Sequence, residues 1–136
     1  MIDFTLVPKV AYEEMNAVHA QEVELLNSIE SLLEIDAPKE QIEAAVEVLF
    51  DHTRKHFANE ERLMQESGFP AFGMHKSEHD RALNEFQYIL MDWKNKKDNS
   101  ILKEYFTSVI PDWLHQHISS MDTVTAQFIV MSKGAV

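Results

Sequence analysis

Hydrophobic residues recur every three or four positions along most of the chain, and this spacing predicts long α-helices. The first helix is expected over residues 13–35, and its apolar stripe consists of Met15, Val18, Leu25, Leu26, Ile29, Leu32 and Leu33. The second and third helices are expected over 39–66 and 71–93. Pro38 suits the first turn of the second helix, and Gly68 suits the left-handed residue that ends it.

The fourth helical region is expected over residues 101–131, and it contains Pro111. Proline lacks a backbone N–H and crowds the preceding turn. We therefore expect either a kink at Pro111 or a short helix that ends near Val109, followed by a new helix. Four long helices with short connections predict an all-α, up-down-up-down four-helix bundle.

The segment before the first helix reads as an extended arm. Residues 1–12 contain Pro8 and lack a helical stripe, and Phe4, Leu6 and Val7 are expected to pack on the body of the protein. We predict a single domain over 1–136, with the arm over 1–12 and the bundle over 13–133.

Composition and charge narrow the classes of function. The chain has 136 residues, a formal net charge of −11, three glycines and four prolines. So few glycines and prolines support the all-α class. Because an acidic surface repels phosphate, neither nucleic acid nor an anionic membrane is expected as a partner. No basic region with a long apolar run opens the chain, and no stretch approaches about 18 uninterrupted apolar residues. The expected localisation is therefore cytoplasmic.

The absence of cysteine limits the chemistry further. It excludes disulfides, iron–sulfur clusters and thiolate zinc sites, and it leaves His, Asp and Glu as the strong metal ligands. A soluble bundle should carry apolar side chains on its inner faces, yet His19 and Glu22 fall within about 40° of the centre of the first stripe. Burying such groups without partners would cost several kcal/mol each.

Ionisable residues also interrupt the other stripes at spacings that suit a metal ion. His56 and Glu60 lie four residues apart, as do His75 and His79, so each pair shares one helix face. Either pair alone is more often a surface pair or a core histidine. Their repetition on successive helices, together with His19, predicts a centre for iron, manganese or zinc.

The pair on the fourth helix is the weakest geometric link. His117 and Asp122 are five residues apart, an offset of about 140° on an ideal helix. They would meet one site only if the helix is overwound or bulged there, or if the aspartate reaches across. His52 rivals Glu60, because it has the same spacing to His56. His115 should point outward.

The order of these residues resembles the hemerythrins, in particular the single-domain bacterial hemerythrins. The elements of the resemblance are His19, His56-x3-Glu60, His75-x3-His79 and His117-x4-Asp122. Local context supports it: Glu60-Glu61-Arg62-Leu63-Met64 in the second helix, Gly68-Phe69-Pro70 ahead of His75, and Trp113-Leu114 ahead of His117-Ile118. The resemblance covers most of the chain.

The resemblance implies a non-haem site with two iron ions and a bridging oxo or hydroxo group. It assigns one iron to His75, His79 and His117, and the other to His19 and His56. It makes Glu60 and Asp122 bridges between the irons, and it gives no ligand role to His52 or His115. Dioxygen would bind at the open position of the two-histidine iron, against a pocket whose walls match Phe57, Trp113, Leu114 and Ile118.

Two positions depart from the family pattern. Asn16 stands where the family usually has Asp, and both can cap a helix or hold a ligand through a hydrogen bond. Glu22 stands where the family has Leu or Ile lining the dioxygen pocket. Its carboxylate either bends away to solvent or a basic group, or bends onto the two-histidine iron and fills or guards the open position. In the second case it is an eighth candidate ligand or an acid–base group.

Two functions therefore compete. The first is a di-iron protein that binds dioxygen or a related small ligand as carrier, store or sensor. The alternative is a di-iron redox enzyme with peroxidase, oxidase or nitric-oxide chemistry, which Glu22 favours. Iron storage would call for Glu-x2-His motifs that the chain lacks, and a purely structural bundle would bind no metal. The redox partner is unknown, and a monomer is the working expectation for the oligomeric state.

Overall fold

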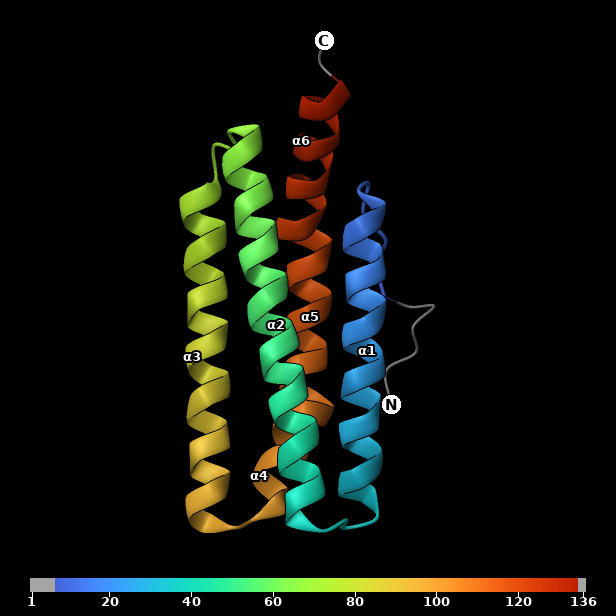
Figure 1. Ribbon diagram of the computed structural model, residues 1–136, viewed down its shortest axis with the longest axis vertical. Coiled ribbons are helices and arrows are strands. Elements are labelled where there is room, and N and C mark those ends of the chain that lie inside the picture. Colours follow the sequence, from blue (N-terminus) through green and yellow to red (C-terminus); the bar gives the residue numbers. More distant parts are fainter. Residues whose placement is uncertain (1–6, 135–136) are drawn as a thin grey trace.

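The computed structural model describes residues 7–134, which form three long helices and one composite helix in an antiparallel bundle (Figure 1). The first three are α1 (Glu13–Glu34), α2 (Lys39–Ser67) and α3 (Phe72–Lys96). The composite helix consists of α4 (Asn99–Glu104), η2 (Tyr105–Val109), α5 (Ile110–His117), η3 (Ile118–Asp122) and α6 (Thr123–Gly134). Successive long helices run in opposite directions, which confirms the predicted up-down-up-down bundle.

Local sequence sets the ends of the second helix. Gly68 adopts a left-handed conformation with φ of 72°, and the backbone N–H of Phe69 donates to the carbonyl of Met64 at 2.9 Å. This is the glycine cap predicted from the sequence. Pro38 lies one position before the helix, as its N-cap, rather than in the first turn.

The composite helix is interrupted near Pro111 by a wide turn and not by an end. Val109 and Ile110 keep right-handed helical angles, and the N–H of Ile110 donates to the carbonyl of Tyr105, five residues earlier. A π turn of this kind inserts one extra residue and shifts the hydrogen-bond register ahead of the proline, which has no N–H to donate. The expectation that a short helix ends near Val109 is therefore wrong.

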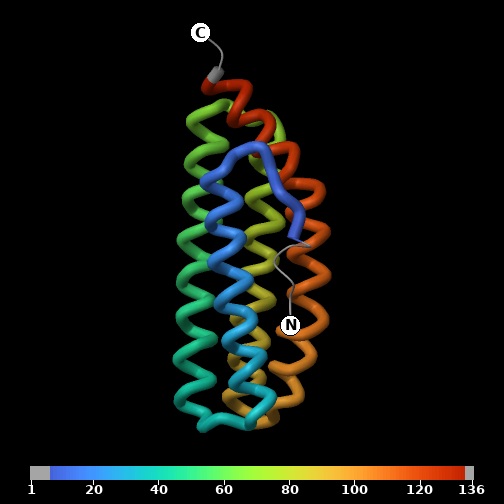
Figure 2. The backbone as a smooth tube through the Cα atoms, turned by 90° about the vertical axis from the view of Figure 1, so that its right-hand side faces the viewer, coloured from blue at the N-terminus to red at the C-terminus, as the bar shows by residue number. Residues whose placement is uncertain are grey.

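The arm is held to the bundle over its described part. Residues 1–6 lie outside the described residues, so the predicted packing of Phe4 and Leu6 is not tested, whereas Val7 packs against the core. The side chain of Asn16 pairs with the backbone of Val10, accepting from its N–H at 2.8 Å and donating to its carbonyl at 2.9 Å. Asn16 thus holds the arm where the chain turns back at the start of α1 (Figure 2).

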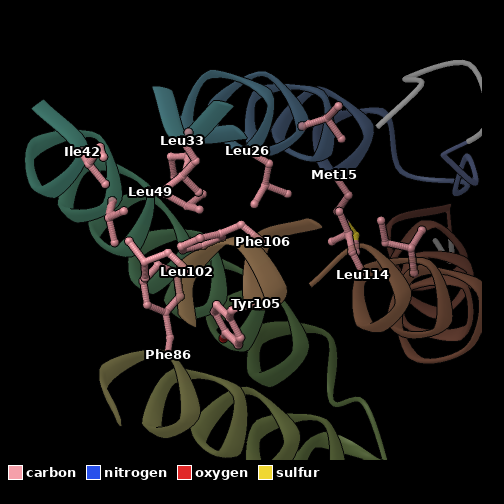
Figure 3. Packing of buried hydrophobic residues seen from close by; sticks show 14 of the residues in the cluster. Met15, Leu26, Leu33, Ile42, Leu49, Phe86, Leu102, Tyr105, Phe106 and Leu114 are labelled. Atoms are coloured by element: carbon pink, nitrogen blue, oxygen red, sulfur yellow. The ribbon is translucent and has the colours of Figure 1, made fainter. Parts of the chain in front are cut away.

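Most of the apolar core lies at one end of the bundle, where the connections α1–α2 and α3–α4 lie. The members at this end come from the second half of α1, the first half of α2, the second half of α3 and the start of the composite helix, and smaller numbers, such as Met15 and Leu114, extend the core toward the other end (Figure 3). The members at the first end include Leu26, Leu33, Ile42, Leu49, Phe86, Leu102, Tyr105 and Phe106. Because the helices alternate in direction, these segments meet at the same end. The opposite segments of each helix carry the buried histidines and carboxylates.

The outer faces of the helices are charged, with pairs one turn apart such as Arg62–Glu66 at 2.8 Å and Lys76–Asp80 at 3.0 Å. Within residues 7–134, no helix offers the length of apolar chain that a bilayer crossing would require.

Candidate metal centre

The structure brings all seven predicted ligands together in the interior of the bundle. One group of converging side chains contains Glu60, His75, His79, His117 and Asp122, and a second contains His19, His56 and Glu60. Within each group the candidate ligand atoms lie within 4.8 Å of one another. We call His75, His79 and His117 the three-histidine side, and His19 and His56 the two-histidine side.

The turn η3 explains how His117 and Asp122 share one site. The N–H of Thr123 donates to the carbonyl of Ile118, five residues earlier, so this is a π turn. A turn that spans five residues places positions five apart on the same side of the helix. The bulged alternative is confirmed, and the overwound one is wrong because the turn is wider than an α-helical turn.

Glu60 lies between the two sides of the centre. Its Oε2 contacts Nε2 of His56. Its Oε1 lies 3.4 Å from Nε2 of His79 and 3.5 Å from Nε2 of His75. One oxygen of this carboxylate therefore faces each side.

Asp122 is arranged in the same way. Its Oδ2 lies 3.1 Å from Nε2 of His19. Its Oδ1 lies 3.2 Å from Nε2 of His75 and 3.3 Å from Nε2 of His117. The two buried carboxylates thus form a double link between the two-histidine and three-histidine sides.

Several atoms at the centre lack the hydrogen bonds that burial normally demands. They are Nε2 of His19, Nε2 of His79, Oε1 of Glu60 and both oxygens of Asp122. Nε2 of His75 and Nε2 of His117 face each other at 3.2 Å, and neutral nitrogens that both lack a proton would have no hydrogen bond to share. Leaving so many polar atoms unpaired is costly. A donor set of imidazole nitrogens and carboxylate oxygens fits iron.

The outer nitrogens of two histidines on the three-histidine side are hydrogen-bonded, which turns their Nε2 atoms inward. The Nδ1–H of His75 donates to the hydroxyl of Thr125 at 2.8 Å, and that of His79 donates to Glu61 at 2.9 Å. Such partners fix the tautomer and the orientation of a metal-binding imidazole. No such role was predicted from the sequence for Thr125 or Glu61. The signal available for Thr125 was a polar residue on the apolar face of the helix, three residues after Asp122.

Two aromatic rings stack on the three-histidine side. The ring of Phe57 lies parallel to that of His79, with 3.8 Å between centroids, and Trp113 lies against His117 at 4.5 Å. The indole N–H of Trp113 donates to Glu78 at 2.7 Å. These contacts hold the imidazoles from the side and keep water away from them.

Glu22 pairs with a basic group, His56, as one sequence alternative allowed, but it does so inside the bundle. Its side chain is buried, with 5% exposed, so it does not bend away to solvent. Its Oε1 accepts a hydrogen bond from Nδ1 of His56 at 2.6 Å, behind the ring and away from Glu60. Neither group of converging ligand atoms includes Glu22. The structure therefore places it beside a predicted ligand.

The charges of the centre perturb its titration when no metal is bound. Burial alone would raise the pKa of Glu22, but the charge on His56 and contacts with His56 and His52 outweigh it and lower the pKa to about 2. Burial opposes the charged form of His56, yet the carboxylates of Glu22 and Glu60 raise its pKa well above the ordinary value. The raised pKa favours the protonated form of His56, which lies between these two carboxylates.

A small cavity adjoins Glu22. Its volume is about 40 Å³, and most of its lining is apolar: Leu26, Leu49, Phe57, Ala82, Phe86, Ile110, Trp113 and Leu114, with Thr53, Tyr105 and Glu22. A water molecule needs roughly 10–15 Å³ on this measure, so a ligand of a few atoms fits. Three of the four expected pocket residues line it, whereas Ile118 is buried elsewhere in the core.

The two rival histidines lie outside the centre. His52 is 23% exposed; its Nε2 contacts Oε1 of Gln21 at 3.0 Å, and its Nδ1 lies 3.7 Å from Glu22. His115 is exposed. Tertiary packing thus decides between Glu60 and His52 as the second candidate ligand beside His56. Spacing along the helix could not make this choice.

Comparison with known proteins gives consistent matches over most of the chain. A family model described as the hemerythrin HHE cation binding domain matches residues 10–129. Bacteriohemerythrin of Aquifex aeolicus is 33% identical over 89% of this chain and 92% of its own length, and that of Ralstonia nicotianae is 26% identical over 84% and 78%. Myohemerythrin of Sipunculus nudus is 30% identical over 64% and 66%. No solved structure gives a significant match.

Proposed function

From the premise that this chain belongs to the hemerythrin family, we propose that it is a non-haem di-iron protein that binds dioxygen or a related small ligand. It acts as a carrier, store or sensor. The observation that carries the proposal is the set of buried ligand atoms without hydrogen bonds, which converge from all four helices in two overlapping groups.

In this proposal each side of the centre holds one iron. His75, His79 and His117 bind one ion, and His19 and His56 bind the other. Glu60 and Asp122 link the two ions together with a solvent-derived oxo or hydroxo bridge. The support for the carboxylate links is that each of them has one oxygen toward each side. A bound pair of irons would supply redox chemistry with one electron from each ion, and the two-histidine side offers fewer protein ligands for a metal than the three-histidine side.

The surrounding residues prepare a dry site for a small ligand. The apolar lining of the cavity excludes water, and its volume of about 40 Å³ admits only a small molecule. Phe57 links the two regions, because its ring stacks on His79 and also lines the cavity.

The test starts with the metal content of the purified, iron-loaded protein. Two irons per chain are expected. After anaerobic reduction, addition of dioxygen should produce a visible absorption band, and removal of dioxygen should abolish it. Protein without bound iron, or iron-loaded protein without any dioxygen-dependent band, would contradict the proposal. His115→Ala is the matched control, because this histidine is exposed and lies outside both groups.

One observation favours the second candidate, a di-iron redox enzyme with peroxidase, oxidase or nitric-oxide chemistry. The carboxylate of Glu22 lies in the wall of a mostly apolar cavity. A carboxylate oxygen beside a bound ligand is placed to accept or donate a proton. Catalytic turnover with peroxide and a reductant, lost in Glu22→Gln, would select the enzyme. A stable and reversible dioxygen complex without turnover would select the binding protein.

A further inference from the structure

Glu22 differs from the other buried carboxylates of the described chain. Glu60 and Asp122 take part in the groups of converging ligand atoms, whereas Glu22 does not. Its hydrogen bond to His56 joins α1 to α2 across 34 residues of sequence. A carboxylate buried in an apolar neighbourhood needs such a partner to offset the cost of burial.

We propose that Glu22 is a positioning residue for the two-histidine side of the metal centre. Its carboxylate accepts the Nδ1–H of His56 and holds the tautomer and ring orientation in which Nε2 faces Glu60. Hydrogen bonds from an imidazole to an ionised carboxylate are short and strong. They also increase the basicity of the opposite nitrogen toward a metal. This inference rests on the proposed metal-binding function.

The outer contacts of the other histidines indicate that Glu22 acts on the two-histidine side alone. On the three-histidine side, His75 donates to a neutral hydroxyl, and His79 donates to Glu61, which is 20% exposed. Stacked aromatic rings also hold that side. On the two-histidine side, Nδ1 of His19 has no hydrogen-bond partner among the described residues. Outer hydrogen bonding there therefore depends on Glu22.

The experiment is a titration of the metal-free protein with Co²⁺, followed by visible absorption and by metal content after gel filtration. The wild-type protein should bind two equivalents tightly. In Glu22→Gln, one equivalent should stay tight, and the affinity for the other should fall by about 10- to 100-fold. Glu22→Leu should lose more, because a glutamine oxygen still accepts the Nδ1–H and a leucine side chain does not.

Two controls locate the effect. Glu24→Gln removes the same charge from an exposed position of α1, and it should leave both equivalents unchanged. Glu61→Gln removes the carboxylate partner of His79, and it should weaken the three-histidine equivalent. The double variant Glu22→Gln/Glu61→Gln should then weaken both equivalents, since the two changes act on different sides.

The outcomes separate this inference from the proposed function. Wild-type protein that fails to bind two equivalents would contradict the two-metal centre itself. Two tight equivalents in Glu22→Gln, or equal loss of both, would overturn the role of Glu22. The same holds if each single variant weakens one equivalent and the double variant still keeps one tight equivalent. Far-UV circular dichroism of the metal-free variants checks that the helices persist. If the leucine variant does not fold, the test rests on the nearly isosteric variant Glu22→Gln.

Discussion

The three-histidine side of the centre combines stacked aromatic rings with carboxylate contacts, whereas the contacts of the two-histidine side are mainly with carboxylates. Phe57 and Trp113 stack on imidazoles of the first side, from α2 and α5. On the second side, His56 lies between the carboxylates of Glu22 and Glu60, and a cavity adjoins Glu22. The comparison teaches that one bundle can surround buried histidines with different neighbours while using the same residue types.

Removal of the metal is expected to have the largest effect. A ligand present at about 1,000 times its dissociation constant stabilises the folded state by about 4 kcal/mol. Two bound ions should therefore raise the midpoint of thermal unfolding by more than about 10 °C in a chain of this size. Calorimetry of iron-loaded and chelated protein measures this difference. His19→Ala should keep one ion and roughly half of the gain, and loss of both ions would show that the three-histidine side is not self-sufficient.

Truncation of Phe57 should rank next. This ring is 2% exposed and stacks on His79, so Phe57→Ala should lower the free energy of unfolding by about 3–5 kcal/mol. Denaturant unfolding of the metal-free protein measures the loss. Phe128→Ala is the control, because that ring is only half-buried and packs on Phe69 away from the centre. Equal losses in the two variants would remove the special role assigned to stacking.

A pH series probes the charged side and should give a somewhat smaller effect. The lowered pKa of Glu22 means that its stabilisation is present above about pH 4.5 and is lost as the pH falls toward about 2. The raised pKa of His56 means that its stabilisation is present below about pH 6.5 and is lost as the pH rises through the raised value. Metal-free protein should therefore be most stable between about pH 4.5 and 6.5, by up to about 3 kcal/mol.

Chemical unfolding of chelated protein at pH 3, 5.5 and 9 measures that window. Both limbs include the contact between Glu22 and His56, so Glu22→Gln should make both of them shallower, while the perturbed pKa values of Glu60 and Asp122 keep part of the pH dependence. An unchanged profile in Glu22→Gln would show that the ionic contact with His56 contributes nothing to folding. Glu24→Gln again supplies the matched change of surface charge on α1.

Much of the fold follows from the sequence, because helical periodicity is a local property. The spacing of apolar residues placed the first three helices within a few residues of their observed bounds, and Gly68 ends α2 as predicted. The disruption near Pro111 was also foreseen, but its form was not. A π turn and a helix end can each accommodate the missing backbone N–H of proline. The packing of the surrounding helix selects between them.

By itself the sequence determined which side chains face the interior, because position along a helix sets direction around it. That includes Glu22, whose place in the first apolar stripe predicted its burial. Tertiary structure alone decided what each inward group touches. Nδ1 of His56 meets Glu22 and Nε2 meets Glu60, and η3 brings Asp122 beside His117. These choices depend on distances between helices that are remote in sequence, which periodicity within one helix does not contain.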